Sequence, residues 1–277
     1  MVFIIVVMIY PLLHVFAMSL SSTAQMDLGN ITVYPLGFDT EGYKFIINNP
    51  QFWNSYKNTL LYVVVGTPIS LLFTSLIAYP LAMKEFVLRK PLSIFLAITL
   101  FFNGGLIPTY LVIQSLGLIN TIWALVLPGA VTTFNVIIYR TFFQSIPIEM
   151  RESAFMDGAN DLTILFRIYM PLSKALLATF GLFSIVGIWN DWFDPLIYFN
   201  NVTMYPIALY LEQMIVQGNF TQGAGGNLAA DAINNLLVSP VTIQMAVVVV
   251  AMLPVLILYP FAQRYFTKGI LIGAIKS

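Results

Sequence analysis

Six long apolar runs, separated by shorter polar segments, divide the chain into candidate membrane spans. They occupy residues 2–20, 59–83, 92–113, 121–143, 175–199 and 241–263. A helix needs about 20 mostly apolar residues to cross about 30 Å of hydrocarbon, and each run is close to that length or longer. The pattern predicts an all-α polytopic membrane protein, with six transmembrane helices in a single domain over residues 1–277.

The composition agrees with this pattern and removes several kinds of site. Hydrophobic residues make up 59% of the chain and charged residues 9%, whereas soluble domains carry about 25% charged residues. With no cysteine and one histidine, His14, the chain has no thiolate and no pair of imidazoles. It also has no glycine-rich phosphate loop ending in Gly-Lys-Ser or Gly-Lys-Thr. We therefore expect no catalytic residue, metal or cofactor in this chain. Its zero net charge also predicts no nucleic-acid partner.

The basic residues fix an orientation for the six-span map. Ten of the twelve lysines and arginines fall on one face, in the segments 84–90, 140–174 and 264–276. The other face carries only Lys44 and Lys57, beside seven acidic residues. Because basic loops stay inside, the map predicts a multi-pass protein of the cell membrane with cytoplasmic N- and C-termini. No basic residue precedes the first run, so we expect a short native segment before it.

The cytoplasmic segment 145–171 has the clearest local pattern. A short amphipathic helix is predicted over 148–157, with Glu149 and Glu152 in its first turns, where the helix dipole favours acids. Gly158 is a natural stop for this helix. Asp161 is then expected to cap a second helix over 162–169, which ends at the following proline. These residues alone fit an amphipathic elbow on the inner membrane surface as well as a docking element.

A spaced motif in this segment distinguishes the two. It begins with Glu152, Ser153 and Ala154 and continues with Gly158 after three intervening residues. Ile168 follows after nine more residues, and Met170 and Pro171 follow after one more. This spacing resembles the Glu-Ala-Ala loop of ABC importer permeases, with serine replacing one alanine and methionine replacing a leucine. Segments 78–80, 104–108 and 189–190 extend the resemblance over most of the chain. The chain looks like the second permease of maltose-type, oligosaccharide-importing systems.

The resemblance implies a type I ABC importer permease fold and a set of partners. These are a second homologous permease, two cytoplasmic ATPases that bind ATP and Mg²⁺, an extracellular solute-binding protein and an oligosaccharide, all at the lipid bilayer. The implied ATPase-coupling residues are Glu149, Glu152, Ser153, Ala154, Asp157 and Gly158. Small Ser153 and Ala154 allow close approach of the ATPase, Glu152 can pair with a basic residue, and Gly158 makes the turn.

Polar residues inside spans are costly and are therefore candidate functional groups. The substrate-pathway candidates are Asn103, Asn135, Trp189, Asn190 and Asp191. An indole face can stack on a sugar ring, and amides or carboxylates can bond its hydroxyls. The alternative is that these residues form interhelical hydrogen bonds and an outer aromatic belt.

Two outer segments have distinct compositions. Residues 21–57 are expected to form a loop with a short interfacial stretch at 52–56. Residues 200–240 begin with a helix-like stretch at 205–216 and continue into a glycine-rich tip. Four of its glycines, Gly218, Gly223, Gly225 and Gly226, are candidates for a probe inserted into the binding protein. A surface loop without a partner is the alternative.

Other functional classes remain open on sequence alone. A permease of the same fold could carry a non-sugar solute. A self-sufficient secondary transporter would show inverted halves and several buried ionisable groups, whereas only Asp191 and Asp194 are candidates here. An intramembrane enzyme would need a partner for His14 or a local aspartyl motif, and neither is evident. ATPase activity that depends on co-expressed subunits would distinguish the permease subunit of an ATP-driven importer from a secondary transporter and from an intramembrane enzyme.

Overall fold

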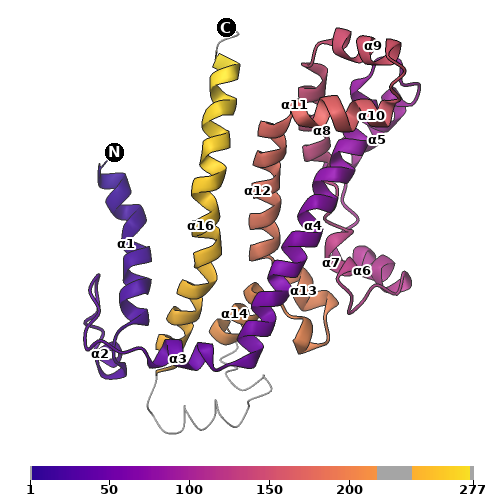
Figure 1. The fold of residues 1–277 in the computed structure, drawn as a ribbon. Helices are drawn as coiled ribbons and strands as arrows, with labels where there is room; N and C mark the ends of the chain where they lie inside the picture. The colour runs from indigo at the N-terminus through magenta and orange to yellow at the C-terminus, as the bar shows by residue number, and fades with distance from the viewer. Residues whose placement is uncertain (1, 217–238, 275–277) are drawn as a thin grey trace. The chain divides into compact units, whose positions relative to one another are not determined.

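The structure is a computed structural model that describes residues 2–216 and 239–274 (Figure 1). Within these residues the regular elements are helices, and the only β pairing is an isolated bridge between Ser21 and Phe38. The all-α class is therefore confirmed. The chain divides into two compact units: unit 1 contains residues 1–60 and 189–258, and unit 2 contains residues 61–188 and 259–277.

Unit 1 combines helices from both ends of the chain with the outer segments. Its elements are α1 (Val2–Ser19), α2 (Thr23–Asp27), α3 (Glu41–Ile47), the first turns of α4 (Pro50–Ala82), α13 (Phe193–Tyr198), the 3₁₀ turn η2 (Val202–Met204), α14 (Ile207–Val216) and the first part of α16 (Pro240–Ala274). Phe52 and Tyr210 pack edge to face in its core. A Cβ on Gly42 would lie 3.2 Å from Thr242 Cγ2, so α3 and α16 meet closely there.

The outer segment 21–57 is more helical than expected. It contains α2, α3 and the first eight residues of α4, so the helix begins at Pro50 rather than at residue 59. Hydropathy missed this start because its polar side chains are satisfied inside unit 1. Gln51 is buried and its Nε2 donates to the Val202 carbonyl at 2.7 Å. Ser55 is also buried, and the Thr59 hydroxyl donates to its carbonyl.

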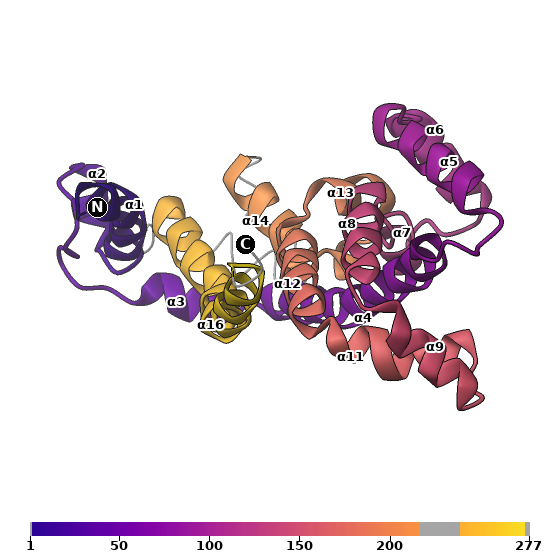
Figure 2. The same ribbon diagram turned by 90° about the horizontal axis from the view of Figure 1, so that it is seen from above.

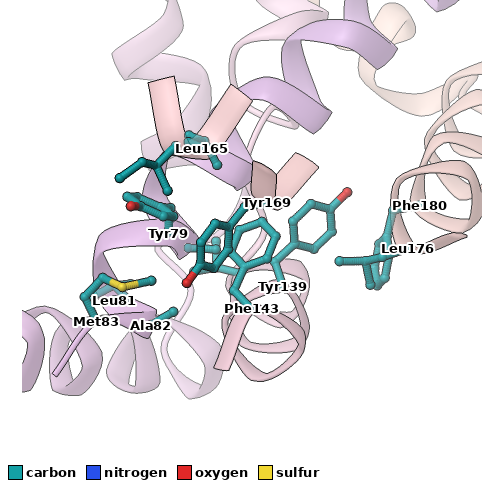
Figure 3. Close-up of a cluster of buried hydrophobic side chains, with 13 residues drawn as sticks. Tyr79, Leu81, Ala82, Met83, Tyr139, Phe143, Leu165, Tyr169, Leu176 and Phe180 are labelled. Carbon is teal, nitrogen blue, oxygen red and sulfur yellow. The ribbon is translucent and has the colours of Figure 1, made fainter. Parts of the chain in front are cut away.

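Unit 2 carries the segment that contains the spaced motif. Besides the rest of α4 it comprises α5 (Arg89–Phe101), α6 (Leu106–Ser115), α7 (Trp123–Val126), α8 (Thr133–Gln144), α9 (Ile148–Met156), α10 (Asp161–Ile164), the π-helical turn η1 (Leu165–Tyr169), α11 (Met170–Leu172) and α12 (Lys174–Asn190). Its core joins α4, α8, η1 and α12 through aromatic rings (Figure 3). Tyr169 packs edge to face on Tyr79 and Phe143, and Tyr139 does so on Phe180.

Two helices are long and apolar enough to cross a membrane on their own. They are α4 and the part of α16 from Pro240 to Ile257. Two bent pairs raise the number to as many as four within the described residues: α5 with α6, bent by 120°, and Asp161–Leu172 with α12, bent by 83°. In α1 the apolar stretch Phe3–Ser19 is shorter than these spans. Six crossings therefore stay a prediction.

The third, fourth and fifth apolar runs are not continuous helices. In the third, Gly105 has φ +84° and the Asn103 carboxamide oxygen accepts its N–H at 3.0 Å, which turns the chain between α5 and α6. In the fourth, Pro128 and Gly129 lie between α7 and α8, and Thr132 caps α8. In the fifth, α12 ends at Asn190 and α13 follows.

Candidate coupling site and polar residues of the spans

Helix α9 lies at one end of unit 2 (Figures 1 and 2). Most of its residues are exposed. It covers Ile148–Met156, which confirms the predicted helix to within one residue. None of its residues is buried, and Glu149, Glu152 and Ser153 are exposed, as is Asp157 at its end. The predicted contact residues are thus accessible to a partner, apart from half-buried Ala154, which packs against the core cluster of unit 2.

Gly158 ends α9 with a Schellman motif. Its φ is +81°, a conformation that costs a residue with a Cβ about 1–2 kcal/mol. The Gly158 N–H donates to the Phe155 carbonyl and the Ala159 N–H donates to the Ala154 carbonyl, both at 2.9 Å. Ala154 and Ala159 also both pack against the core cluster. Gly158 therefore performs the predicted stop and directs the chain back toward the core.

The inner side of α9 is held by Arg151, whose side chain is only 14% exposed. Its guanidinium lies 3.2 Å from a carboxylate oxygen of Glu85 and 3.5 Å from one of Asp161. It also lies over the Phe155 ring, 4.6 Å from the centroid. The Tyr79 hydroxyl donates to the same Asp161 oxygen at 2.9 Å. This group, which we call the Arg151 network, connects α9 to α10 and to the end of α4.

The charges of the Arg151 network favour an ionised arginine. Partial burial alone lowers the pKa of Arg151, but the Tyr79 oxygen and the carboxylates of Asp161 and Glu85 outweigh it and raise the pKa above its ordinary value. Arg151, Asp161, Glu85 and Tyr79 also line a cavity of about 460 Å³ behind α9. The contacts that Arg151 makes for α9 are thus largely polar, whereas the core cluster of unit 2 is rich in aromatic side chains.

The helix after α9 differs from the prediction in its cap and its end. Asn160, not Asp161, is the N-cap: its side-chain oxygen accepts the Thr163 N–H at 2.8 Å. Asp161 is the first helical residue and its carboxylate is used in the Arg151 network. The helical path also passes Pro171 by one residue, to Leu172. A π-helical turn precedes the proline, with the Met170 N–H bonded to the Leu165 carbonyl.

Asn103 and Asn135 lie at the breaks of the third and fourth apolar runs. Asn103 is exposed and its side chain closes the turn before α6. Asn135 is half-buried in the first turn of α8, and its N–H donates to the Thr132 hydroxyl at 3.4 Å. A 2.9 Å hydrogen bond between the Thr99 and Thr133 hydroxyls connects α5 to α8. The Asn103 side chain thus has a local role in the turn, whereas the bond at Asn135 uses its backbone N–H. The part of both residues in a substrate pathway stays a prediction.

Trp189, Asn190 and Asp191 lie at and just beyond the end of α12, within unit 1. Trp189 is 4% exposed, donates its indole N–H to the Ala251 carbonyl at 3.1 Å and packs edge to face on Tyr56. Trp189 and Asn190 line a cavity of about 230 Å³ whose other walls are apolar side chains of α14 and α16. Asp191 accepts the Asp194 N–H at 3.2 Å in the turn before α13.

The remaining predicted site lies outside the described residues. Gly218, Gly223, Gly225 and Gly226 all fall between residues 217 and 238. The helix-like stretch before them is confirmed as α14. Within residues 2–216 and 239–274, no group of three His, Cys, Asp or Glu side chains is placed to hold a metal ion.

Sequence reasoning missed the Arg151 network. Arg151 lies on a short helix, and its partners Glu85 and Asp161 are 66 residues before and 10 residues after it, so spacing could not pair them. A weak signal was available for one member, because Tyr79 lies in the segment 78–80 that carries the family resemblance. Asn160, with Thr163 three residues later, was a second usable signal for a helix cap.

Its long apolar helices define this chain as an α-helical membrane protein. Residues 52–272 match the family described as binding-protein-dependent transport system inner membrane component. The chain belongs to this family of ABC importer permeases, and it is a transport subunit rather than an enzyme.

Two relatives from Bacillus subtilis (strain 168) cover nearly the whole chain. Protein LplC is 40% identical over 269 residues, which is 97% of this chain and 90% of that protein. The polygalacturonan/rhamnogalacturonan transport system permease protein YtcP is 37% identical over 274 residues, covering 97% of this chain and 93% of that protein.

Solved structures show the same fold. A chain of a bacterial ABC transporter involved in the import of the acidic polysaccharide alginate is 33% identical, with a TM-score of 0.88 over 95% of this chain and 92% of that chain. A bacterial alginate ABC transporter in complex with alginate pentasaccharide-bound periplasmic protein matches at 18% identity and a TM-score of 0.52, over 82% and 81% of the two chains. The second match supports the fold alone.

Proposed function

We propose that this chain is the membrane-spanning permease of an ATP-driven oligosaccharide importer, with α9 as the helix that docks on a separate ATPase. The observation that carries this is the contrast between the two sides of α9. Its outer side exposes Glu149, Glu152 and Ser153, and its inner side is fixed through Arg151 and Ala154. A docking helix needs an accessible surface and a firm attachment, and α9 has both.

The complete importer would contain a second homologous permease, two ATPases that bind ATP and Mg²⁺, and an extracellular solute-binding protein. The charge distribution supports six crossings with residues 145–171 and both termini in the cytoplasm and residues 200–240 outside. Closure of the ATPases would act on α9 and open the outer side of a central cavity, while the glycine-rich loop would contact the docked binding protein. This chain itself would bind no metal or cofactor.

The substrate proposal rests on the relatives. One is named for polygalacturonan and rhamnogalacturonan, and one solved transporter imports the acidic polysaccharide alginate. Uronate-bearing oligosaccharides are therefore the first substrates to test, beside neutral ones. Trp189, Asn190 and Asp191 are proposed as contacts at the end of α12, and Asn103 and Asn135 as contacts at the breaks of the other runs.

Two serines give a matched test of docking. Ser153 on α9 and Ser145 at the end of α8 are both exposed, and each hydroxyl donates to a carbonyl of its own helix. Ser153→Phe is expected to abolish co-purification with the ATPase and binding-protein-stimulated ATP hydrolysis, and Ser145→Phe to preserve both. Normal hydrolysis and uptake in Ser153→Phe would remove α9 as the docking helix. Uptake by the permease without any ATPase would instead favour a secondary transporter.

A further inference from the structure

We propose that unit 2 contains a binding site for the phosphate headgroup of an anionic lipid, between the end of α4, the start of α5 and α8. The site is a cavity of about 610 Å³. Four cationic side chains line it, Lys84, Arg89, Lys90 and Arg140, against one acid, Glu85. The orientation of this cavity toward the cytoplasm rests on the topology proposed above.

The positive charge of this cavity is not neutralised by the protein. Among the lysines and arginines of residues 3–216, the ion pairs are those of Lys44 and Arg151. The one acid in the wall, Glu85, is 3.2 Å from Arg151. Arg89 and Arg140 are close enough to repel each other. Holding like charges together is unfavourable, so a bound anion would relieve the repulsion.

Hydrogen bonds position one of these cations, Arg140, before any ligand arrives. Arg140 Nη1 donates to the Ser93 hydroxyl at 2.9 Å, and that hydroxyl donates to the Arg89 carbonyl at 2.6 Å. Arg140 is half-buried, and its planar guanidinium has further donors in a fork that matches phosphate oxygens. The cavity is therefore built for an oxyanion rather than for a carbonyl or hydroxyl.

The start of α5 adds to the positive potential. This 13-residue helix has no acid in its first turn and no side-chain cap, and it begins with Arg89 and Lys90. Acids are favoured at helix N-termini because of the helix dipole, and cations there are unfavourable. An anionic ligand in the cavity would reverse this local penalty.

The apolar surroundings identify the source of the phosphate as a lipid. Val87, in the cavity wall, is 89% exposed, and Ile94 on α5 is also exposed. Helix α5 has no buried residue, and exposed apolar side chains, including Phe95 and Ile98, continue along it. Acyl chains could lie along α5 while the headgroup occupies the cavity. Anionic lipids of the cytoplasmic leaflet are attracted to such basic pockets between spans.

The test uses the complete importer in nanodiscs of phosphatidylglycerol diluted in phosphatidylcholine, with bound lipid counted by native mass spectrometry. Lys84→Gln combined with Lys90→Gln removes two exposed cations that take part in no ion pair within residues 3–216. Each basic residue near an anionic surface is worth about a fivefold preference, so retention of phosphatidylglycerol over phosphatidylcholine is expected to fall about 25-fold. Lys57→Gln, an exposed cation of unit 1, is the control and should change nothing.

Three outcomes would overturn the proposal. Wild-type retention of phosphatidylglycerol in the double variant would show that the cavity does not select the lipid. An equal loss in Lys57→Gln would show a general charge effect. Displacement of the lipid by millimolar inorganic phosphate would assign the cavity to a soluble anion. Arg140→Lys supplies a second arm, since it keeps the charge but loses the fork, and a loss of retention there supports direct phosphate contact. If the Ser153→Phe test showed that α9 does not dock on the ATPase, the expected lipid retention would be unchanged.

Discussion

Substitutions at Gly158 distinguish two roles of this residue: its backbone conformation, which shapes the loop, and its contact with a partner. The residue has φ +81° and ends α9, and a Cβ added to it would have no atom of the described chain within 4 Å. An added Cβ therefore meets no steric conflict inside the protein, and the internal cost of alanine is backbone strain. Alanine and leucine bring the same strain but different bulk, whereas asparagine tolerates the left-handed conformation and still adds bulk.

The magnitude follows from this geometry. Forcing a residue with a Cβ into the left-handed region costs about 1–2 kcal/mol, which changes the population of the folded loop by about 5- to 30-fold. Amide hydrogen exchange over 148–159 should rise by this factor in both Gly158→Ala and Gly158→Leu, and by less in Gly158→Asn. The two hydrogen bonds of the Schellman motif, from Gly158 and Ala159, are the ones lost on opening.

Function should follow bulk instead of strain. In the reconstituted importer we expect binding-protein-stimulated ATP hydrolysis to fall sharply in Gly158→Leu, to fall clearly in Gly158→Asn and to fall only slightly in Gly158→Ala. The reason is that Gly158 is exposed and an added Cβ has open space around it, so bulk here is added at the surface proposed to dock on the ATPase. Membrane insertion should be normal in all three variants.

Two results would refute this reasoning. If Gly158→Leu and Gly158→Ala lose hydrolysis to the same extent, the surface around Gly158 is not in contact with the ATPase. If exchange rates in Gly158→Asn match those in Gly158→Ala, the left-handed conformation is not what the glycine provides.

Four further predictions address other parts of the chain. Single cysteines at Ser153 and Gly225 should label from opposite sides of the membrane, and same-side labelling would refute the six-span map. Arg151→Gln should raise exchange in α9 and lower ATP hydrolysis, because it removes two ion pairs to largely exposed carboxylates, of about 0.2–1 kcal/mol each, and a cation–π contact of about 0.5–1 kcal/mol; unchanged exchange would show that the Arg151 network does not hold the helix. Trp189→Ala should reduce uptake of neutral and uronate-bearing oligosaccharides alike, while Trp189→Phe keeps a ring and most of the uptake; wild-type uptake in Trp189→Ala would limit the residue to packing. Asp191→Asn should harm uronate-bearing substrates least, since a repelling charge is lost, and equal effects on both substrate types would contradict this.

The sequence predicted the helical class and the loop because both depend on local signals. Apolar runs of about 20 residues indicate helices in a membrane wherever they occur. The first loop helix, its acidic first turn and its glycine stop lie within eleven consecutive residues, 148–158, so short-range rules describe them. The same rules predicted the helix-like stretch 205–216, and α14 begins within it, at Ile207.

The breaks and the polar attachments depend on longer-range structure. Whether Gly105 continues a helix or reverses it depends on its φ, which composition does not reveal. The early start of α4 depends on the Val202 carbonyl, 151 residues away, which accepts from Gln51. The Arg151 network likewise joins residues from three segments. On a hydropathy scale, polar side chains such as Gln51 and Arg151 are unfavourable in a buried helix, so hydropathy predicts that the helix ends there.

Tyr79 explains how a signal from α9 could enter the spans. It lies in α4, three residues before the helix ends, with its hydroxyl on Asp161 and its ring against Tyr169. A shift of α9 that moves the Arg151 network would therefore act on a buried side chain of a spanning helix. Helix α4 has 33 residues and is about 50 Å long at 1.5 Å per residue, and its residues belong to both compact units.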